Sequence, residues 1–273
     1  MLQIQKYIFL VFCFFAAKTI LAQCDVVNTT FKGGEVLTYR AAYNWGFVWI
    51  DAGIVDFKVR ETTFENNEVY QFNAVGTSLP RYDSFFKVRD NFNSMALRSN
   101  LQPIRASRDN SEGDYQVKNY YTFNYSKKEI YATVENTNTP RFNDTIALSS
   151  CIYDLLTGVY KVRNMNFSNL KINDKLPINM IIDNEVFSLY VRYLGKETIT
   201  LPDTHDTYNC IKFSPLLVDG TIFKGGEGMT VWVTDDKNKI PVMVEAQILV
   251  GSVKAILTNA TGLRYPLTAK ISE

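Results

Sequence analysis

Apolar and polar residues alternate along most of the chain with a period of two, which is typical of β-strands. In one clear example, Val242, Val244 and Ala246 share one face of a strand, and the residues between them share the other. The same alternation recurs in other segments, among them 55–60, 120–125, 130–134, 178–182 and 187–193. Roughly a dozen or more short strands at regular spacing predict an all-β fold, either an antiparallel sandwich or a barrel-like sheet.

Pairs of turn-forming residues separate several of the predicted strands. Lys127-Lys128 precedes the strand at 130, Asp183-Asn184 separates two strands, and Gly251-Ser252 follows the strand predicted at 241–249. Asp, Asn and Gly favour tight turns because their backbones or side chains suit the angles required there. We therefore predict hairpins at these points.

An acidic stretch, Asp-Asp-Lys-Asn-Lys at 235–239, lies between the strands predicted at 229–234 and 241–249. It could form a cation site, an acid/base pair or a turn. A calcium loop needs more oxygen ligands, spaced over about a dozen residues. We therefore interpret Asp235 and Asp236 as turn residues.

One segment departs from the alternation and has the spacing of a helix. Ile152, Leu155, Leu156 and Val159 recur at helical intervals, and Ser149 or Ser150 could cap the start. We predict the one substantial helix from about Ser149 to Arg163. Those four apolar residues should be buried against the sheet, and three charged residues should face water, namely Asp154, Lys161 and Arg163.

The first 22 residues have the features of a secretory signal peptide. Lys6 supplies the positive start, 7–17 is an apolar run, and Ala22 stands just before the expected cleavage site. We predict cleavage before Gln23, a single β-rich domain at 23–273, and a periplasmic location. The alternative is an outer-membrane lipoprotein anchored through Cys24, although that processing favours a small residue where Gln23 stands.

The charge of the chain does not favour a nucleic-acid partner, and its hydropathy does not favour a transmembrane helix after the signal. The chain has 29 Lys and Arg residues and 28 Asp and Glu residues, and Lys6 and Lys18 belong to the predicted signal. A nearly neutral chain with scattered charges gives no electrostatic basis for binding nucleic acid. Beyond the signal, no stretch is apolar for long enough to form a transmembrane helix.

Three cysteines follow the predicted cleavage site, namely Cys24, Cys151 and Cys210. An odd number leaves at least one unpaired thiol. We interpret Cys151 and Cys210 as buried, unreactive thiols, because free cysteine packs as a small hydrophobic residue. Whether these two pair with each other stays open.

The residues of common catalytic and metal sites do not occur together in this sequence. His205 is the one histidine, and no nucleophile elbow of the hydrolase type accompanies it. Zinc and iron sites lack their usual clustered ligands. The glycine pairs Gly33-Gly34 and Gly225-Gly226 precede predicted strands, so they indicate turns and not phosphate loops. We predict no catalytic residues, no cofactor and no metal site.

Several motifs resemble those of a bacterial family known as domain of unknown function DUF3108. They are GGEVLTYRAAYNWGFVWIDAG at 33–53, FKVRDNFNSMAL at 86–97, LQPIRASRDNSEGDY at 101–115, YDLLTGVYKVR at 153–163 and VWVTDDKNKIPV at 231–242. They occur in the family's order over nearly the whole chain after the signal. The resemblance implies an exported, mostly β protein of the cell envelope, and it implies no activity.

Two groups of residues are candidates for ligand binding. Tyr43, Trp45, Phe47 and Trp49 crowd one predicted hairpin, with odd-numbered positions expected on one face. They form either core packing or the wall of an apolar cavity. Arg89 and Arg105, with their neighbours, form either an inward ion-pair cluster or exposed strand charges; those neighbours are Asp90 and Arg108.

These observations favour a non-catalytic binding or carrier module for an apolar or lipid-like ligand. The alternative is a structural or assembly factor that contacts another envelope protein, and an unrecognised hydrolase ranks third. An enclosed apolar cavity on the order of several hundred Å³ would favour the carrier. A filled core with an exposed apolar patch would favour the assembly factor.

Overall fold

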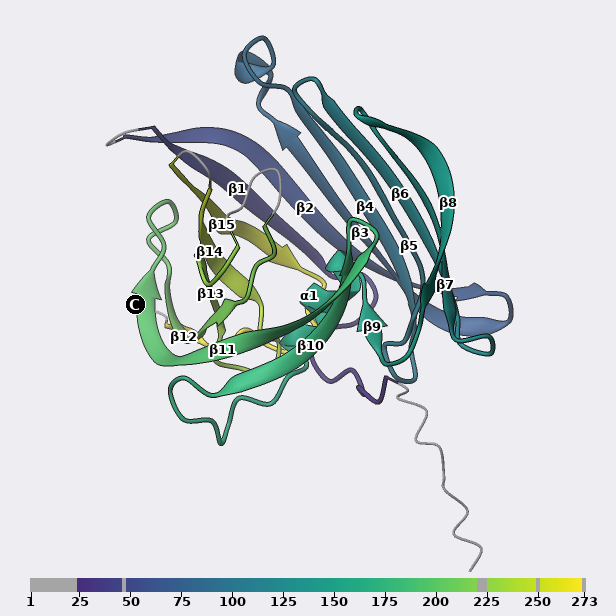
Figure 1. Ribbon diagram of the computed structural model, residues 1–273. Helices are drawn as coiled ribbons and strands as arrows, with labels where there is room; N and C mark the ends of the chain where they lie inside the picture. Colours follow the sequence, from purple (N-terminus) through teal and green to yellow (C-terminus); the bar gives the residue numbers. More distant parts are fainter. Residues whose placement is uncertain (1–23, 46–47, 220–224, 249–250, 272–273) are drawn as a thin grey trace, which may run out of the picture.

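The computed structural model describes residues 24–45, 48–219, 225–248 and 251–271. In this part of the chain, one sheet of 16 strands curls around a single α-helix (Figure 1). The strands run in the order β8-β7-β6-β5-β4-β3-β2-β1-β15-β14-β13-β12-β11-β10-β9, and β16 pairs with β12. The prediction of an all-β, barrel-like fold with one substantial helix is confirmed.

The elements have the following bounds: β1 Val36–Trp45, β2 Val48–Phe64, β3 Asn67–Ser78, the 3-10 helix η1 Pro80–Tyr82, β4 Val88–Leu97, β5 Pro103–Glu112, β6 Tyr115–Asn124, β7 Glu129–Asn136, β8 Thr139–Ala147, β9 Ile152–Tyr153, α1 Leu155–Arg163, β10 Lys175–Ile182, β11 Glu185–Thr200, β12 Thr207–Pro215, β13 Met229–Thr234, β14 Pro241–Gln247, β15 Ser252–Thr261 and β16 Lys270–Ile271. The predicted signal segment lies outside the described residues.

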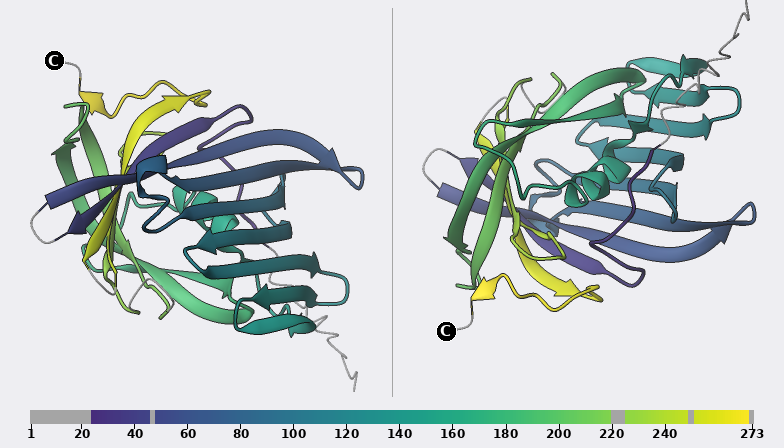
Figure 2. Two further views of the ribbon diagram at one scale, coloured as in Figure 1. Left: turned by 90° about the horizontal axis from the view of Figure 1, so that it is seen from above. Right: turned by 90° about the horizontal axis from the view of Figure 1, so that it is seen from below.

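The sheet has two halves. Strands β2 to β8 form a broad, gently curved half, and β10 to β15 form a more tightly curled half, with α1 between them (Figure 2). Neighbours pair antiparallel, except that β9 runs parallel to β10. The helix is far too short to cross a membrane, as is any other helix in the described ranges. The inner face that meets α1 is therefore the place where residues from many strands converge.

Turn chemistry sets the hairpins, as the sequence predicts. Ile182 pairs with Glu185 across the two-residue turn Asp183-Asn184, whose φ angles are 45° and 71°. Positive φ at both positions defines the hairpin turn that matches the twist of a β-sheet, and Asp and Asn tolerate it. β6 and β7 are joined by residues 125–128, in which Lys128 has a φ of 57°, and Gly251 begins the return into β15.

The acidic stretch is a turn between β13 and β14, but its two aspartates have different surroundings. One oxygen of Asp236 accepts hydrogen bonds from the Thr234 hydroxyl and from the backbone N–H groups of Asn238 and Lys239. Its other oxygen accepts from the Ala269 N–H. Asp235 instead forms an ion pair with Lys196 near the surface. Asp236 is thus a structural residue of this turn.

The helix differs from its prediction at both its start and its buried face. It begins at Leu155 because the preceding Ile152 and Tyr153 pair with β10 as β9. Asp154 is the N-cap residue, so its carboxylate is buried and not in water: it accepts hydrogen bonds from the backbone N–H groups at the helix start. The helix therefore starts where strand β9 ends, and its N-cap is Asp154 and not a serine.

The buried residues of α1 are Leu156, Thr157, Gly158, Tyr160 and Arg163, whereas Leu155, which was also expected to be buried, is only half-buried. Val159 was expected in the core, but it is 39 % exposed, and Arg163 was expected in water, but it is 2 % exposed. The reason is that the N-terminal segment 24–35 of the same chain packs along the helix and covers the face that carries Tyr160 and Arg163. Phe31 from this segment contacts the Tyr160 ring edge-on, with 4.8 Å between ring centroids.

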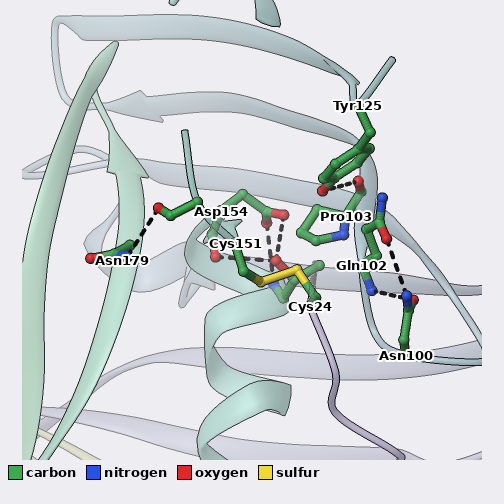
Figure 3. The surroundings of a disulfide bond; sticks show 10 residues. Cys24, Asn100, Gln102, Pro103, Tyr125, Cys151, Asp154 and Asn179 are labelled. Atoms are coloured by element: carbon green, nitrogen blue, oxygen red, sulfur yellow. Dashed lines mark hydrogen bonds between the residues drawn. A yellow bond between two sulfur atoms is a disulfide. The ribbon is translucent and has the colours of Figure 1, made fainter. Parts of the chain in front are cut away.

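A disulfide joins this N-terminal segment to the start of the helix region. Cys24 and Cys151 are bonded, with 5.0 Å between their Cα atoms and a sequence separation of 127 (Figure 3). The interpretation of Cys151 as a free thiol is therefore wrong, and it does not pair with Cys210. Cys210 is buried and unpaired, and burial raises the pKa of its thiol to about 12.

Candidate ligand-binding site

The aromatic hairpin does not present its rings on one face. Across the β1–β2 turn, Trp45 pairs with Val48, so Asn44 lies opposite Trp49 and Tyr43 lies opposite Ile50. Paired residues point to the same side of a sheet, which puts Tyr43 and Trp49 on opposite faces. The Trp49 ring is 36 % exposed, and the Lys254 ammonium lies 4.3 Å from its centroid. Phe47 and the side chain of Trp45 lie outside the described residues.

Arg89 and Arg105 are not close to each other, and neither points to the inner face. Arg89 forms an ion pair with Asp83 at 2.5 Å and donates to the Ser78 hydroxyl at 2.9 Å. The side chain of Arg105 is 51 % exposed and lies 3.5 Å from the Glu65 carboxylate. Both arginines alternate with inward residues along their strands. They are therefore exposed strand charges, one of the two interpretations that the sequence left open.

The inward positions on these same strands carry a different set of polar residues. Asp90 of β4 pairs directly with Asn110 of β5, and Arg108 of β5 pairs with Asn119 of β6. The tip of the β10–β11 hairpin lies over them. We call this group the inner polar patch, and it consists of Asp90, Arg108, Asn110, Asn119, Asp183 and Asn184.

Hydrogen bonds hold the hairpin tip against the sheet. One oxygen of Asp183 accepts from the Arg108 guanidinium at 2.7 Å and from the Asn119 amide at 3.3 Å. The backbone N–H of Asn184 donates to the Tyr121 hydroxyl at 3.0 Å, and its side-chain amide donates to Asp144 at 2.8 Å. The tip thus reaches β5, β6 and β8, although the sheet order places these strands far from β10.

Several polar atoms in the patch have no hydrogen-bond partner within the protein. They are the Oδ1 atoms of Asp90, Asn110, Asn119 and Asn184 and the Nε atom of Arg108. Asn110 is only 3 % exposed and Asn119 only 2 %. A buried polar group without a partner costs about 1–3 kcal/mol. Five such atoms in one place indicate a site that is completed by something other than the chain itself.

Asp90 adds a group that changes charge near neutral pH. Burial, and after it the negative charge of Glu112, raise the pKa of its carboxyl to about 7, although the positive charge of Arg108 and a hydrogen bond from the Ser111 backbone oppose this rise. Carboxyl groups with pKa values displaced this far by burial and a charged partner are concentrated at functional sites.

A small cavity lies beside the patch, between the sheet, the hairpin tip and the start of α1. Its volume is about 20 Å³, enough for a single water molecule. Its lining combines polar residues, among them Ser94, Arg108, Asn119, Asp154 and Asp183, with the apolar residues Phe92, Ala106, Leu155, Ile181 and Ile182. Burial raises the pKa of Asp154, and the hydrogen bonds from Ser94 and the helix start oppose this effect. This cavity is too small for a lipid chain.

The chemistry available in the patch is recognition by hydrogen bonds. Four unpaired acceptor oxygens and one unpaired donor match a ligand that offers several O–H or N–H groups and at least one acceptor. His205, the one histidine, lies in the exposed loop between β11 and β12 and does not belong to the patch.

Sequence reasoning identified Asp90 and Arg108 as possible inward charges but missed the three asparagines. One signal was present: Ala106, Arg108 and Asn110 fall on one face of β5, and a small apolar residue at the start of that face indicates that it is buried. The hairpin tip gave no such signal, because its position over β5 and β6 depends on the curl of the whole sheet.

A comparison with solved structures supports the barrel-like curl of the sheet. A solved structure, described as a beta-barrel-like protein of domain of unknown function DUF1849 from Brucella abortus, matches with a TM-score of 0.53 and 8 % sequence identity. The match covers 83 % of this chain and 96 % of that one, and at this identity it shows the fold alone.

The family follows from a separate match to the sequence. The family model described as Protein of unknown function (DUF3108) matches residues 38–258, and the chain belongs to this family. The resemblance drawn from the sequence motifs is therefore confirmed. No curated protein matches the chain.

Proposed function

We propose that this protein is an exported, non-catalytic binding module of the bacterial cell envelope, and that its ligand is a small hydroxyl-rich molecule such as a sugar unit held at the inner polar patch. The observation that carries this proposal is the group of five buried polar atoms without partners. A hydroxyl group both donates and accepts, so a sugar can satisfy the asparagine oxygens and Arg108 Nε together.

The geometry suggests how such a ligand reaches the patch. The Asp183 carboxylate accepts hydrogen bonds from the Arg108 guanidinium and from the Asn119 amide, so the hairpin tip covers this part of the patch. A ligand hydroxyl pair replaces these contacts when the tip moves away from β5. The Phe92 ring, which the Arg108 guanidinium overlies at 5.8 Å, supplies an apolar face next to the polar groups.

The apolar or lipid-like ligand expected from the sequence finds less support. That ligand needs an enclosed apolar space of at least about 300 Å³, whereas the cavity beside α1 has about 20 Å³. An apolar ligand would need a large apolar space on this inner face, whereas a hydroxyl-rich ligand would need the unpaired polar atoms that lie there.

The disulfide supports export and a released protein. Disulfides persist in oxidising compartments such as the periplasm. The sulfur of Cys24 is bonded to Cys151, so it is not available for the thioether that anchors a lipoprotein. This supports the periplasmic location over the outer-membrane lipoprotein that Cys24 also suggested.

Ligand-observed NMR with a panel of mono- and disaccharides, including N-acetylglucosamine, tests the proposal. We expect binding by the wild type, loss of binding in Arg108→Ala, and unchanged binding in Arg105→Ala. Arg105 is the matched control because it lies on the same strand but on the opposite face. Urea denaturation of each variant shows whether it remains folded.

The same samples test the lipid carrier with a fluorescent fatty-acid probe. Tight binding of the probe, without binding of any saccharide, would replace the proposed ligand class with the apolar one. Saccharide binding that persists in a folded Arg108→Ala variant would remove the inner polar patch as the site.

A further inference from the structure

The loop between β3 and β4 exposes two adjacent phenylalanines. Phe85 is 77 % exposed and Phe86 is 50 % exposed. Figure 1 shows this loop, with the short helix η1, projecting beyond the ends of the neighbouring strands at the top of the molecule. We call residues 81–87 the aromatic tip. Single exposed apolar side chains are common, but a projecting pair of large ones marks a contact surface.

The exposure is built into the loop by its hydrogen bonds. The backbone N–H groups of Phe85 and Phe86 both donate to the Tyr82 carbonyl at 2.9 Å, and the Tyr82 N–H donates to the Leu79 carbonyl at 2.9 Å. The side chain of Asp83 accepts from Arg89 and Ser78. These hydrogen bonds, Arg89 first, hold the pKa of the Asp83 carboxyl below its usual range. The backbone is thus fixed in a shape that presents both rings outward.

Within the aromatic tip itself, the two cationic residues Arg81 and Lys87 outnumber the one acidic residue, Asp83. Arg81 and Lys87 are exposed on either side of them. Asp83 is neutralised by its ion pair with Arg89. The Arg81 guanidinium lies 5.0 Å from the centroid of the Tyr82 ring and donates to the Asp51 carbonyl at 3.3 Å. The tip therefore combines an apolar end with flanking cations.

We propose that the aromatic tip docks on an anionic lipid surface, with Phe85 and Phe86 inserted at the boundary of headgroups and acyl chains and Arg81 and Lys87 placed among the phosphates. Aromatic and cationic side chains together favour this interface. A narrow, projecting tip suits insertion between lipids. A stable protein partner needs about 800 Å² of surface on each side, which two phenylalanines at the end of a loop do not offer.

The experiment is co-sedimentation with vesicles, which needs no saccharide and so is independent of the proposed ligand. The wild-type protein without its first 22 residues is mixed with vesicles of phosphatidylcholine and phosphatidylglycerol, and separately with vesicles of phosphatidylcholine alone. We expect stronger binding to the anionic vesicles, and we expect this preference to weaken as salt is added.

Two variants test the two parts of the tip. The double variant Phe85→Ser/Phe86→Ser should bind anionic vesicles at least about tenfold more weakly, because insertion of each ring contributes on that scale. Arg81→Gln/Lys87→Gln should lose about fivefold for each charge and lose most of the preference for anionic lipid. Phe142→Ser is the matched control, because Phe142 is 40 % exposed on the edge strand β8 and should not change binding.

All of the changed side chains are exposed, so the urea midpoint of every variant should stay close to that of the wild type. The proposal is overturned if the wild type binds neither kind of vesicle. It is also overturned if Phe142→Ser reduces binding as much as the phenylalanine pair does. Concentration-dependent self-association that the Phe85→Ser/Phe86→Ser variant abolishes, without vesicle binding, would assign the tip to a second copy of the chain instead.

Discussion

The guanidinium of Arg163 and the carboxylate of Glu35 form a bidentate ion pair in the protein interior, although 128 residues separate them. Nη1 donates to Oε1 at 2.6 Å and Nη2 donates to Oε2 at 2.9 Å, and the side chains are 2 % and 1 % exposed. The Asn238 carbonyl accepts two further hydrogen bonds from the same guanidinium. One side chain at the end of α1 therefore links the N-terminal segment to the β13–β14 turn.

Loss of one partner of this pair should be severe. Glu35→Gln leaves the Arg163 charge buried without its counter-ion, and we expect the free energy of unfolding to fall by about 3–5 kcal/mol. Glu245→Gln breaks a partly exposed pair with Lys254 and should cost less than about 1 kcal/mol. Urea denaturation of the two variants compares them directly. Equal losses in the free energy of unfolding would mean that the interior pair stabilises the fold no more than the partly exposed pair does.

The disulfide makes a prediction about both thiol count and stability. The chain that begins at residue 23 should show one reactive thiol when it is denatured without reductant, because Cys24 and Cys151 are bonded and Cys210 is free. A count of three would contradict the pairing. Cys24→Ser/Cys151→Ser should lower the free energy of unfolding by about 2–5 kcal/mol, since the bond closes a long loop in the unfolded chain.

The two neighbouring aspartates of the β13–β14 turn should respond differently to the same change. Asp236→Ala removes four hydrogen-bond acceptor contacts, three of them to backbone N–H groups, and should cost about 2–4 kcal/mol. Asp235→Ala removes an ion pair near the surface and should cost less than about 1 kcal/mol. Thermal and urea unfolding provide the comparison. A neutral Asp236→Ala would show that the turn holds its shape without the carboxylate.

The helix offers a matched pair of apolar residues. Leu156 is 4 % exposed and Val159 is 39 % exposed. Leu156→Ala should therefore lower the free energy of unfolding by about 2–5 kcal/mol, and Val159→Ala should stay within about 1 kcal/mol of the wild type. Comparable losses from the two variants in urea denaturation would restore the buried stripe predicted from the sequence.

Asp90 should make stability depend on pH in a defined direction. Its folded-state pKa of about 7 lies above the value of about 4 in an unfolded chain, so the folded protein holds this proton more tightly. The contribution of Asp90 is fully present below pH ~4 and is lost as pH rises through about 7. The stability of Asp90→Asn relative to the wild type should thus rise between about pH 4 and about pH 7, the window set by those two values.

Asp109→Asn is the control for the loss of a carboxylate in this part of the sheet, because Asp109 lies on β5 on the opposite face and is half exposed. A wild-type protein whose stability difference from Asp90→Asn is flat with pH would mean that Asp90 does not titrate in this window.

The sequence by itself determined the strands, most of the hairpins and the presence of the helix. These features depend on neighbours within a few residues. Alternation at 242–247, the Asp183-Asn184 turn and helical spacing near Leu156 each state a local preference that the fold keeps. The family motifs followed the same logic, because they consist of these local elements in a fixed order.

Only the tertiary structure decided which face of each element is buried and which distant residues meet. Alternation shows that Arg105 and Arg108 lie on opposite faces of β5, but it does not show which of the two faces is enclosed when the sheet curls. The positions of Val159 and Arg163 depended on the N-terminal segment, and the bond between Cys24 and Cys151 depended on the same docking. The inner polar patch exists because curling brings the β10–β11 tip onto β5 and β6, and such long-range closure leaves no local pattern in the chain.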